Sequence, residues 1–228
     1  MLETLFSSLT LFGLGLVLGL QHALEADHVV AVSTLVSQTK SLKKSAVLGA
    51  VWGLGHTLTL FIVGAAVLLF NLAIPESLAR LFEFFVGLLL TILGIDLVRK
   101  VLRGEIHLHE HEHPEEGVVH THIHSHSHSP AHHHTHRSFF IGLVHGLAGS
   151  GALVLLVLTT VQSVSEGVVF ILVFGVGSIL GMWLTSIAIA LPFKFISRFE
   201  KVNSTLRVVA GVISIALGVI VMLEMASG

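Results

Sequence analysis

Long stretches of apolar residues, joined by short polar connections, make up most of this chain. Crossing a bilayer takes about 20 apolar residues, and six stretches are long enough: 4–37, 45–70, 77–102, 138–162, 166–192 and 204–225. Charged residues make up only 11% of the chain, against about 25% in soluble domains. The mean hydropathy is +0.90. The sequence therefore predicts an all-α polytopic membrane protein with six transmembrane helices.

The first apolar stretch is too long for one simple span. As a straight helix, residues 4–37 would measure about 51 Å, whereas the hydrocarbon layer is about 30 Å thick. Near its midpoint the sequence reads Gln21-His22-Ala23-Leu24-Glu25-Ala26-Asp27-His28. Interrupted helices near the midplane form ion sites in many transporters. We therefore expect a long first helix that is kinked or broken at residues 22–28.

The polar residues of this stretch have the chemistry of a divalent metal site. Ionisable groups inside a span cost several kcal/mol each and are usually functional. Imidazole and carboxylate ligands suit nickel, cobalt, zinc and iron. A regular helix would place His22 and His28 on different faces, whereas Glu25 is three residues from each. Either Glu25 bridges them, or a break brings His22, Asp27 and His28 together. The alternative is a polar patch that only ties helices together.

Two further histidines lie within later apolar stretches. His56 follows Gly53-Leu54-Gly55, whose glycines permit close helix approach. His145 begins the sequence His-Gly-Leu-Ala-Gly-Ser-Gly. Both are candidate metal ligands, and for both the alternative is a core histidine that only packs between helices. Ser150 and Ser178 are weaker candidates.

A weak internal repeat relates the two halves of the chain. Residues 19–24 resemble 142–147 at an offset of 123, and residues 52–56 resemble 174–178 at an offset of 122. Two glycines of the third span, Gly87 and Gly94, match two of the sixth at an offset of 124. Three spans in each half predict a 3+3 inverted repeat. The expected units are 1–103 with the metal motif, a loop over 104–137, and 138–228.

The basic residues predict the orientation in the membrane. In a six-span arrangement, eleven of the twelve lysines and arginines fall on one side, and only Arg80 falls on the other. Because basic loops remain in the cytoplasm, we expect a plasma-membrane protein with both termini outside. The loop over 104–137 is then cytoplasmic.

This loop is rich in histidine. Of the 17 histidines in the chain, 13 lie between His107 and His136, many in alternating His-x-His steps with interleaved glutamates. Such a composition cannot bury a core, so we expect a disordered segment that binds several divalent ions weakly. Its expected role is to buffer, sense or hand on metal.

The pattern His-x4-Asp-His from His22 to His28 resembles the signature of the nickel/cobalt transporter family. Leu54-Gly55-His56-Thr57 resembles that family's second signature. Longer members have eight spans, usually with arginine where this chain has Gln21 and aspartate where it has Glu25. The six-span length, the His145 motif and the histidine-rich loop are more similar to a shorter branch. That branch includes urease-accessory-type nickel transporters and nickel/cobalt efflux proteins.

The resemblance implies a secondary transporter of nickel or cobalt that works by alternating access, and we favour uptake. The ligand candidates are His22, Glu25, Asp27, His28, His56 and His145. Efflux by proton exchange and a metal sensor or buffer without flux remain open. The expected partners are a divalent metal ion, the lipid bilayer and a cytoplasmic metallochaperone, with no nucleic acid.

An enzyme is not expected. Ser150 lies five residues from His145 on one short segment, a poor arrangement for a nucleophile and its base. The chain has no His-Glu-x-x-His zinc motif and no nucleotide-binding Gly-x4-Gly-Lys-Ser/Thr motif. It has no cysteine, which excludes thiolate metal sites and iron–sulfur clusters. We therefore expect no catalytic cofactor, and a transported metal as the bound ion.

Overall fold

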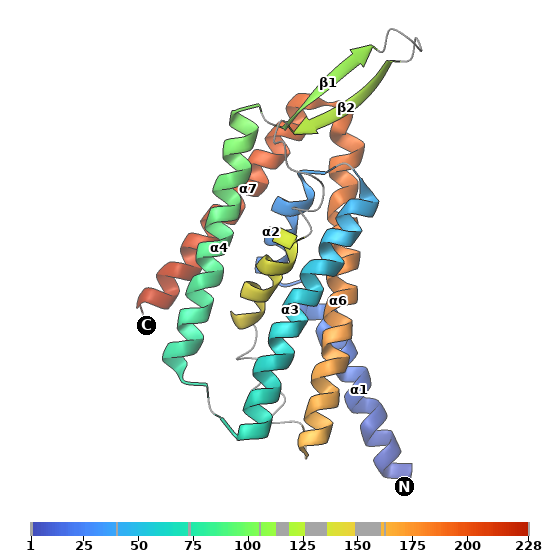
Figure 1. The fold of residues 1–228 in the computed structure, drawn as a ribbon, viewed down its shortest axis with the longest axis vertical. Coiled ribbons are helices and arrows are strands. Elements are labelled where there is room, and N and C mark those ends of the chain that lie inside the picture. Colours follow the sequence, from blue (N-terminus) through green and yellow to red (C-terminus); the bar gives the residue numbers. More distant parts are fainter. Residues whose placement is uncertain are drawn as a thin grey trace.

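The computed structural model is a bundle of helices aligned along one long axis (Figure 1). It describes residues 2–39, 41–72, 74–104, 106–112, 119–125, 136–148, 161 and 163–227. The helical elements in chain order are α1 (Leu2–His22), α2 (Ala26–Val36), α3 (Leu42–Phe70), α4 (Glu76–Leu102), the segment 136–148, α6 (Val164–Phe195), the 3₁₀ turn η1 (Ile196–Arg198) and α7 (Glu200–Ser227).

Four helical stretches among the described residues are long and apolar enough to cross a membrane. They are Leu42–Phe70, Glu76–Leu102, Val164–Arg198 and Glu200–Ser227. The outward faces of these helices are apolar; Leu58 and Ile62 of α3 and Leu184 of α6 are all exposed, as lipid contact requires. The chain is therefore a helical membrane protein. The count of six spans stays a prediction, because the first stretch is divided and the fourth is described only as far as residue 148.

The first apolar stretch is broken where the sequence predicts. α1 ends at His22 and α2 begins at Ala26. Between them the chain tightens: Leu24 N donates to Gln21 O and Glu25 N donates to His22 O, each across three residues. Glu25 then takes an extended conformation and starts a new helix. This break places Asp27 and His28 on the first turn of α2, inside the bundle.

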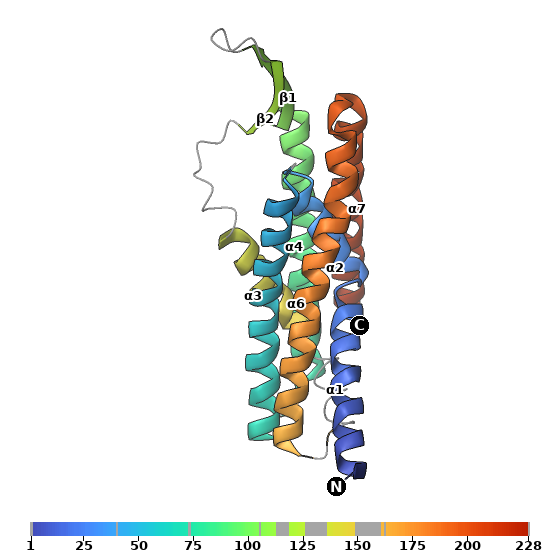
Figure 2. The same ribbon diagram turned by 90° about the vertical axis from the view of Figure 1, so that its right-hand side faces the viewer.

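The short helix α2 lies at the centre of the bundle. It contacts α3, α4, α6 and α7. Ala31, Val32 and Val36 are at most 1% exposed and belong to the main hydrophobic core. α6 packs between α1 and α3 (Figure 2), and α4 packs against α7. The polar groups that α2 carries are therefore shielded from lipid on several sides.

Glycines allow the close approach of paired helices. Gly87 lies against Gly218, and Gly94 against Gly211, where α4 crosses α7. In each pair, a methyl group added to one glycine would collide with the carbonyl oxygen of the other. Between these two points the Ser214 hydroxyl donates to the Leu90 carbonyl at 2.7 Å.

The same kind of contact joins α1 to α6 and α3 to the segment 136–148. In each case a glycine packs directly on a backbone carbonyl of the neighbouring helix. The pairs are Gly19 on Phe174, Gly177 on Leu16, Gly142 on Trp52 and Gly55 on Phe139. Small residues of this kind are typical of helix interfaces in membranes.

The bundle is all-helical, as predicted, and one pair of strands lies outside it. Strands β1 (Ile106–Glu112) and β2 (Val119–Ser125) form an antiparallel pair beyond the end of α4 (Figure 1). Part of the loop predicted to be disordered therefore has a regular backbone. The physical reason is the period of the sequence: His-x-His alternates every two residues, which is the repeat of a strand.

Candidate metal site

Four histidines from four elements meet inside the bundle. His22 ends α1, His28 lies on the first turn of α2, His56 is in the middle of α3, and His145 belongs to the segment 136–148. The His28 ring is central: its centroid lies 4.5 Å from that of His22, 4.5 Å from that of His145 and 5.0 Å from that of His56. His28, His56 and His145 are at most 1% exposed.

One group of imidazoles converges on a single point. Nε2 of His22 lies 3.0 Å from Nε2 of His56. One ligand nitrogen from each of His22, His28 and His56 lies within 4.8 Å of the other two. Two nitrogens bound to one ion at about 2.1 Å would be about 3.0–3.4 Å apart. The three imidazoles therefore fit a divalent ion with small adjustments.

Carboxylates stand behind two of these imidazoles. Glu25 Oε1 is 2.9 Å from Nδ1 of His22. Asp27 Oδ1 accepts from both the backbone N and the ring Nδ1 of His28, each at 2.9 Å. An imidazole that donates from Nδ1 has its lone pair on Nε2 when it is neutral. Both carboxylates thus turn the Nε2 lone pair towards the cluster, as carboxylates bonded to metal-binding histidines do.

Asp27 also reaches the second half of the chain. Its Oδ2 accepts from Nε2 of His145 at 2.9 Å, so both carboxylate oxygens hold imidazoles. Asp27, His28 and His145 form a second group with ligand atoms within 4.8 Å of one another. The two groups share His28.

Aromatic rings line part of the cluster. The Trp52 ring centroid lies 5.4 Å from that of His28 and 5.5 Å from that of His145. The Phe174 ring centroid lies 5.4 Å from that of His22. Three buried ring nitrogens have no partner among the described residues: His28 Nε2, His56 Nδ1 and His145 Nδ1. Leaving such an atom without a partner costs about 1–3 kcal/mol, and a ligand bound at the cluster would offset that cost.

All six predicted site residues come together at this cluster, and their binding of metal stays a prediction. Glu25 is the most exposed of the carboxylates, at 57% against 30% for Asp27. Ser178 is fully buried, with no described partner for its hydroxyl, and Ser150 lies outside the described residues. Trp52 was missed by sequence reasoning. It stands four residues before His56, hence on the same helix face, and that spacing was the available signal.

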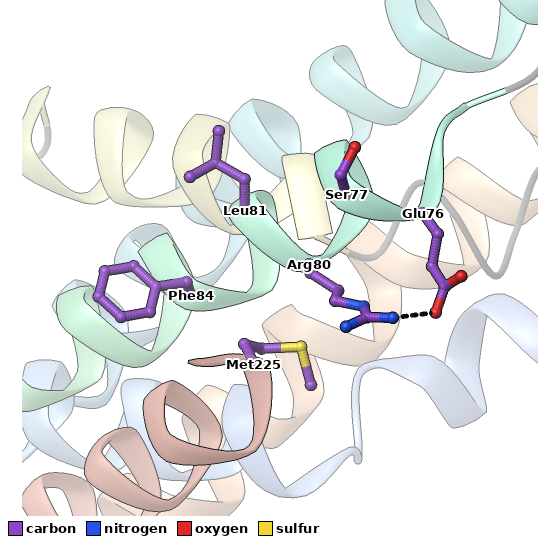
Figure 3. Close-up of a pocket in the computed structure, with 6 residues that line it drawn as sticks. All are labelled: Glu76, Ser77, Arg80, Leu81, Phe84 and Met225. Carbon is purple, nitrogen blue, oxygen red and sulfur yellow. Dashed lines mark hydrogen bonds and ion pairs between the residues drawn. The ribbon is translucent and has the colours of Figure 1, made fainter. Parts of the chain in front are cut away.

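A separate pocket lies between the start of α4 and the end of α7 (Figure 3). Its rim has an ion pair in which Arg80 donates to Glu76 at 2.5 Å. The other lining residues are Ser77, Leu81, Phe84 and Met225. None of the six predicted ligands lines this pocket, and its one cation is already paired with a carboxylate. It therefore does not compete with the histidine cluster as a metal site.

Two comparisons with known proteins give matches. The family described as "Cytochrome C biogenesis protein transmembrane region" matches residues 57–220. The urease accessory protein UreH of Bacillus sp. (strain TB-90) is 37% identical over 211 residues, which cover 92% of this chain and 90% of that protein. No solved structure matches the chain.

Proposed function

The chain belongs to the families of the urease accessory protein UreH and of the cytochrome C biogenesis transmembrane region, and from this we propose that it is a secondary transporter of nickel or cobalt ions. The name of the relative connects it with urease, and the His-x4-Asp-His pattern is similar to that of nickel/cobalt transporters. Thiol–disulfide exchange is not available to this chain, because it has no cysteine.

The observation that carries the proposal is the convergence of imidazoles inside a membrane bundle. His22, His28 and His56 are the proposed ligands, and Glu25 and Asp27 hold two of them in position. Imidazole ligands favour late first-row divalent ions over magnesium and calcium. His145, with Asp27, provides a second position next to the first. The ion would lose most of its water on reaching the cluster.

Alternating access in this proposal follows from a 3+3 inverted repeat. The glycine contacts support it, because they occur in related pairs. The repeat pairs Gly19 with Gly142 and Phe174 with Trp52. The contact of Gly19 on Phe174 therefore corresponds to the contact of Gly142 on Trp52. A pseudo-two-fold axis in the membrane plane relates contacts in this way.

The two halves differ in the residues at corresponding positions of the cluster. The first half contributes His22, Asp27, His28 and His56, whereas the corresponding positions of the second half are His145, Ser150, Gly151 and Ser178. The ion is therefore held mainly by the first half, and His145 is the contribution of the second. A rocking motion between the halves would change the distance between Asp27 and His145.

The membrane potential can drive uptake without a nucleotide. A potential of 100 mV corresponds to about 2.3 kcal/mol per charge, hence about 4.6 kcal/mol for a divalent ion. This would support about 2000-fold accumulation. We propose this direction together with the predicted orientation, in which the histidine-rich loop faces the cytoplasm of a plasma-membrane protein.

The test is metal flux in proteoliposomes, comparing nickel, cobalt and zinc under an imposed voltage and then an imposed pH gradient. We expect voltage-driven entry of nickel or cobalt that is abolished in His28→Ala. The matched control is His136→Ala, which removes an exposed histidine outside the cluster. Wild-type flux through His28→Ala would refute the proposed site. Movement only against a proton gradient would replace uptake by exchange.

A further inference from the structure

A narrow apolar seam begins at the histidine cluster and follows α2. It is lined by Val32, Leu35 and Val36 of α2, by Leu48, Gly49 and Trp52 of α3, and by Ser186 of α6. The seam leaves no room for a water molecule. An ion cannot pass along it while α2, α3 and α6 are packed in this way.

Trp52 forms the wall between the histidine cluster and the seam. Its ring contacts those of His28 and His145 on one side and lines the seam on the other. Trp52 is fully buried and belongs to both the cluster and the lining of the seam, so the two adjoin at this residue.

The seam is directed towards the end of the bundle that carries the histidine-rich loop. We call this the loop end; α4 ends there at Leu102 and the segment 136–148 begins there. Just beyond α2, the Gln38 side chain accepts from Lys100 Nζ at 3.1 Å. Lys100 donates to Asp96 at 2.9 Å, and Arg137 donates to the same Asp96 oxygen at 3.0 Å. These bonds fix the far end of α2 to the two elements that flank the loop.

Ser186 is the unusual residue in the seam. Its hydroxyl is fully buried and has no partner among the described residues, and the same holds for the Trp52 indole nitrogen. Two other equally buried serines are bonded across helix interfaces, since Ser214 donates to Leu90 O and Ser138 to Leu48 O. Ser178, next to the histidine cluster, also has no partner among the described residues. An unmet hydroxyl costs about 1–3 kcal/mol. An opening of the seam that admits water or an ion would satisfy the Ser186 hydroxyl.

We infer that the seam is the path, closed in this structure, along which the hydrated divalent ion moves between the histidine cluster and the loop end. Ser186 and the Trp52 N–H are the polar groups on that path, and it opens when α2 separates from α3 and α6. This inference rests on the proposed transport function, but the opening of the seam can be measured without metal.

The chain has no cysteine, so a single introduced thiol can be followed without background. We would label Ser186→Cys with a charged, membrane-impermeant methanethiosulfonate in right-side-out and inverted vesicles. The matched control is Ser214→Cys, equally buried but outside the seam. The loop end is marked by His136→Cys and the opposite end by Asn71→Cys. Val36→Cys on α2 is the second seam variant, in case Ser186→Cys fails to fold.

We expect Ser186→Cys to react about tenfold faster than Ser214→Cys, a population difference of about 1.4 kcal/mol. The reaction should occur only from the side that labels His136→Cys, and it should block nickel flux. Labelling no faster than Ser214→Cys, or from the side of Asn71→Cys, would overturn the inference, as would labelling that leaves flux unchanged. Failure of the proposed transport function can be distinguished from failure of this inference, because it would appear as absent nickel flux in the unlabelled wild type.

Discussion

Asp27 and His145 are separated by 118 residues in the chain, yet Asp27 Oδ2 lies 2.9 Å from His145 Nε2. The same carboxylate holds His28 through its other oxygen. One side chain thus joins the two proposed halves at the histidine cluster. Because both of its oxygens are engaged, we expect Asp27 to orient these imidazoles and not to bind the ion itself.

Asp27→Ala should abolish transport, because it leaves two buried imidazoles without the group that orients them. Asp27→Asn keeps an oxygen in place and should retain nickel binding with about 10–100-fold weaker affinity, the usual cost of losing a carboxylate that orients a metal-binding histidine. Isothermal titration of detergent-solubilised protein measures this. Complete loss of binding in Asp27→Asn would instead make Asp27 a direct ligand.

Glu25→Gln should have a smaller effect than Asp27→Asn. Glu25 also holds an imidazole, but it is 57% exposed, so water and salt weaken its interaction with His22. We expect an affinity loss of only about two- to fivefold. The same titration checks it, and a loss as large as that of Asp27→Asn would contradict the assigned difference.

Nickel binding should weaken as the pH falls. An imidazole must be unprotonated to bind metal, so protons compete with the ion and are released when it binds. The apparent affinity for nickel should therefore be lower in acidic than in neutral buffer. Calorimetry in two buffers of different ionisation enthalpy would measure the released protons. A pH-independent affinity would argue against histidine ligands.

Lys100→Met should loosen the loop end of α2. It removes the bonds from Lys100 to Gln38 and to Asp96, which are partly exposed and worth at most about 1 kcal/mol together. Labelling of Ser186→Cys in this background should therefore rise about two- to fivefold. Lys201→Met, on an exposed part of α7, is the control. An unchanged rate would show that these bonds do not keep the seam closed.

Gly94→Val should destabilise the bundle, because the added carbons would meet the Gly211 carbonyl and the Ile215 side chain. Overpacking of this kind typically costs about 1–3 kcal/mol. Gly13→Val is the control, since nothing lies within 4 Å of the position that its Cβ would take. Thermal unfolding in detergent compares the two. Equal melting temperatures would argue against the close packing of α4 on α7.

The break in the first apolar stretch was predictable because its cause is local. The stretch is longer than the bilayer is thick, and its polar residues are concentrated at its midpoint. The hydrogen bond between Asp27 and His145 could not be predicted, because contacts between distant residues depend on how helices pack. The sequence indicated only that both were unusual in apolar surroundings. The unmet hydroxyl of Ser186 is likewise invisible in the sequence, where buried serines with and without partners look alike.

The strands were missed for a different reason. Composition indicated a segment without a core, whereas the strands follow the two-residue period of the same histidines. The place of Trp52 at the site could also have been predicted from the sequence, because Trp52 and His56 are about one helical turn apart.

The break between α1 and α2 has an electrostatic consequence. Each helix has a partial charge at its ends, about half a unit negative at its carboxyl terminus and positive at its amino terminus. His22 lies at the negative end of α1, where a cation is favoured, and Asp27 lies at the positive end of α2, where a carboxylate is favoured. A continuous helix through residues 23–25 would cancel both fields. The interruption therefore favours a positive charge beside His22 and an ionised carboxylate at Asp27, which an unbroken helix would not do.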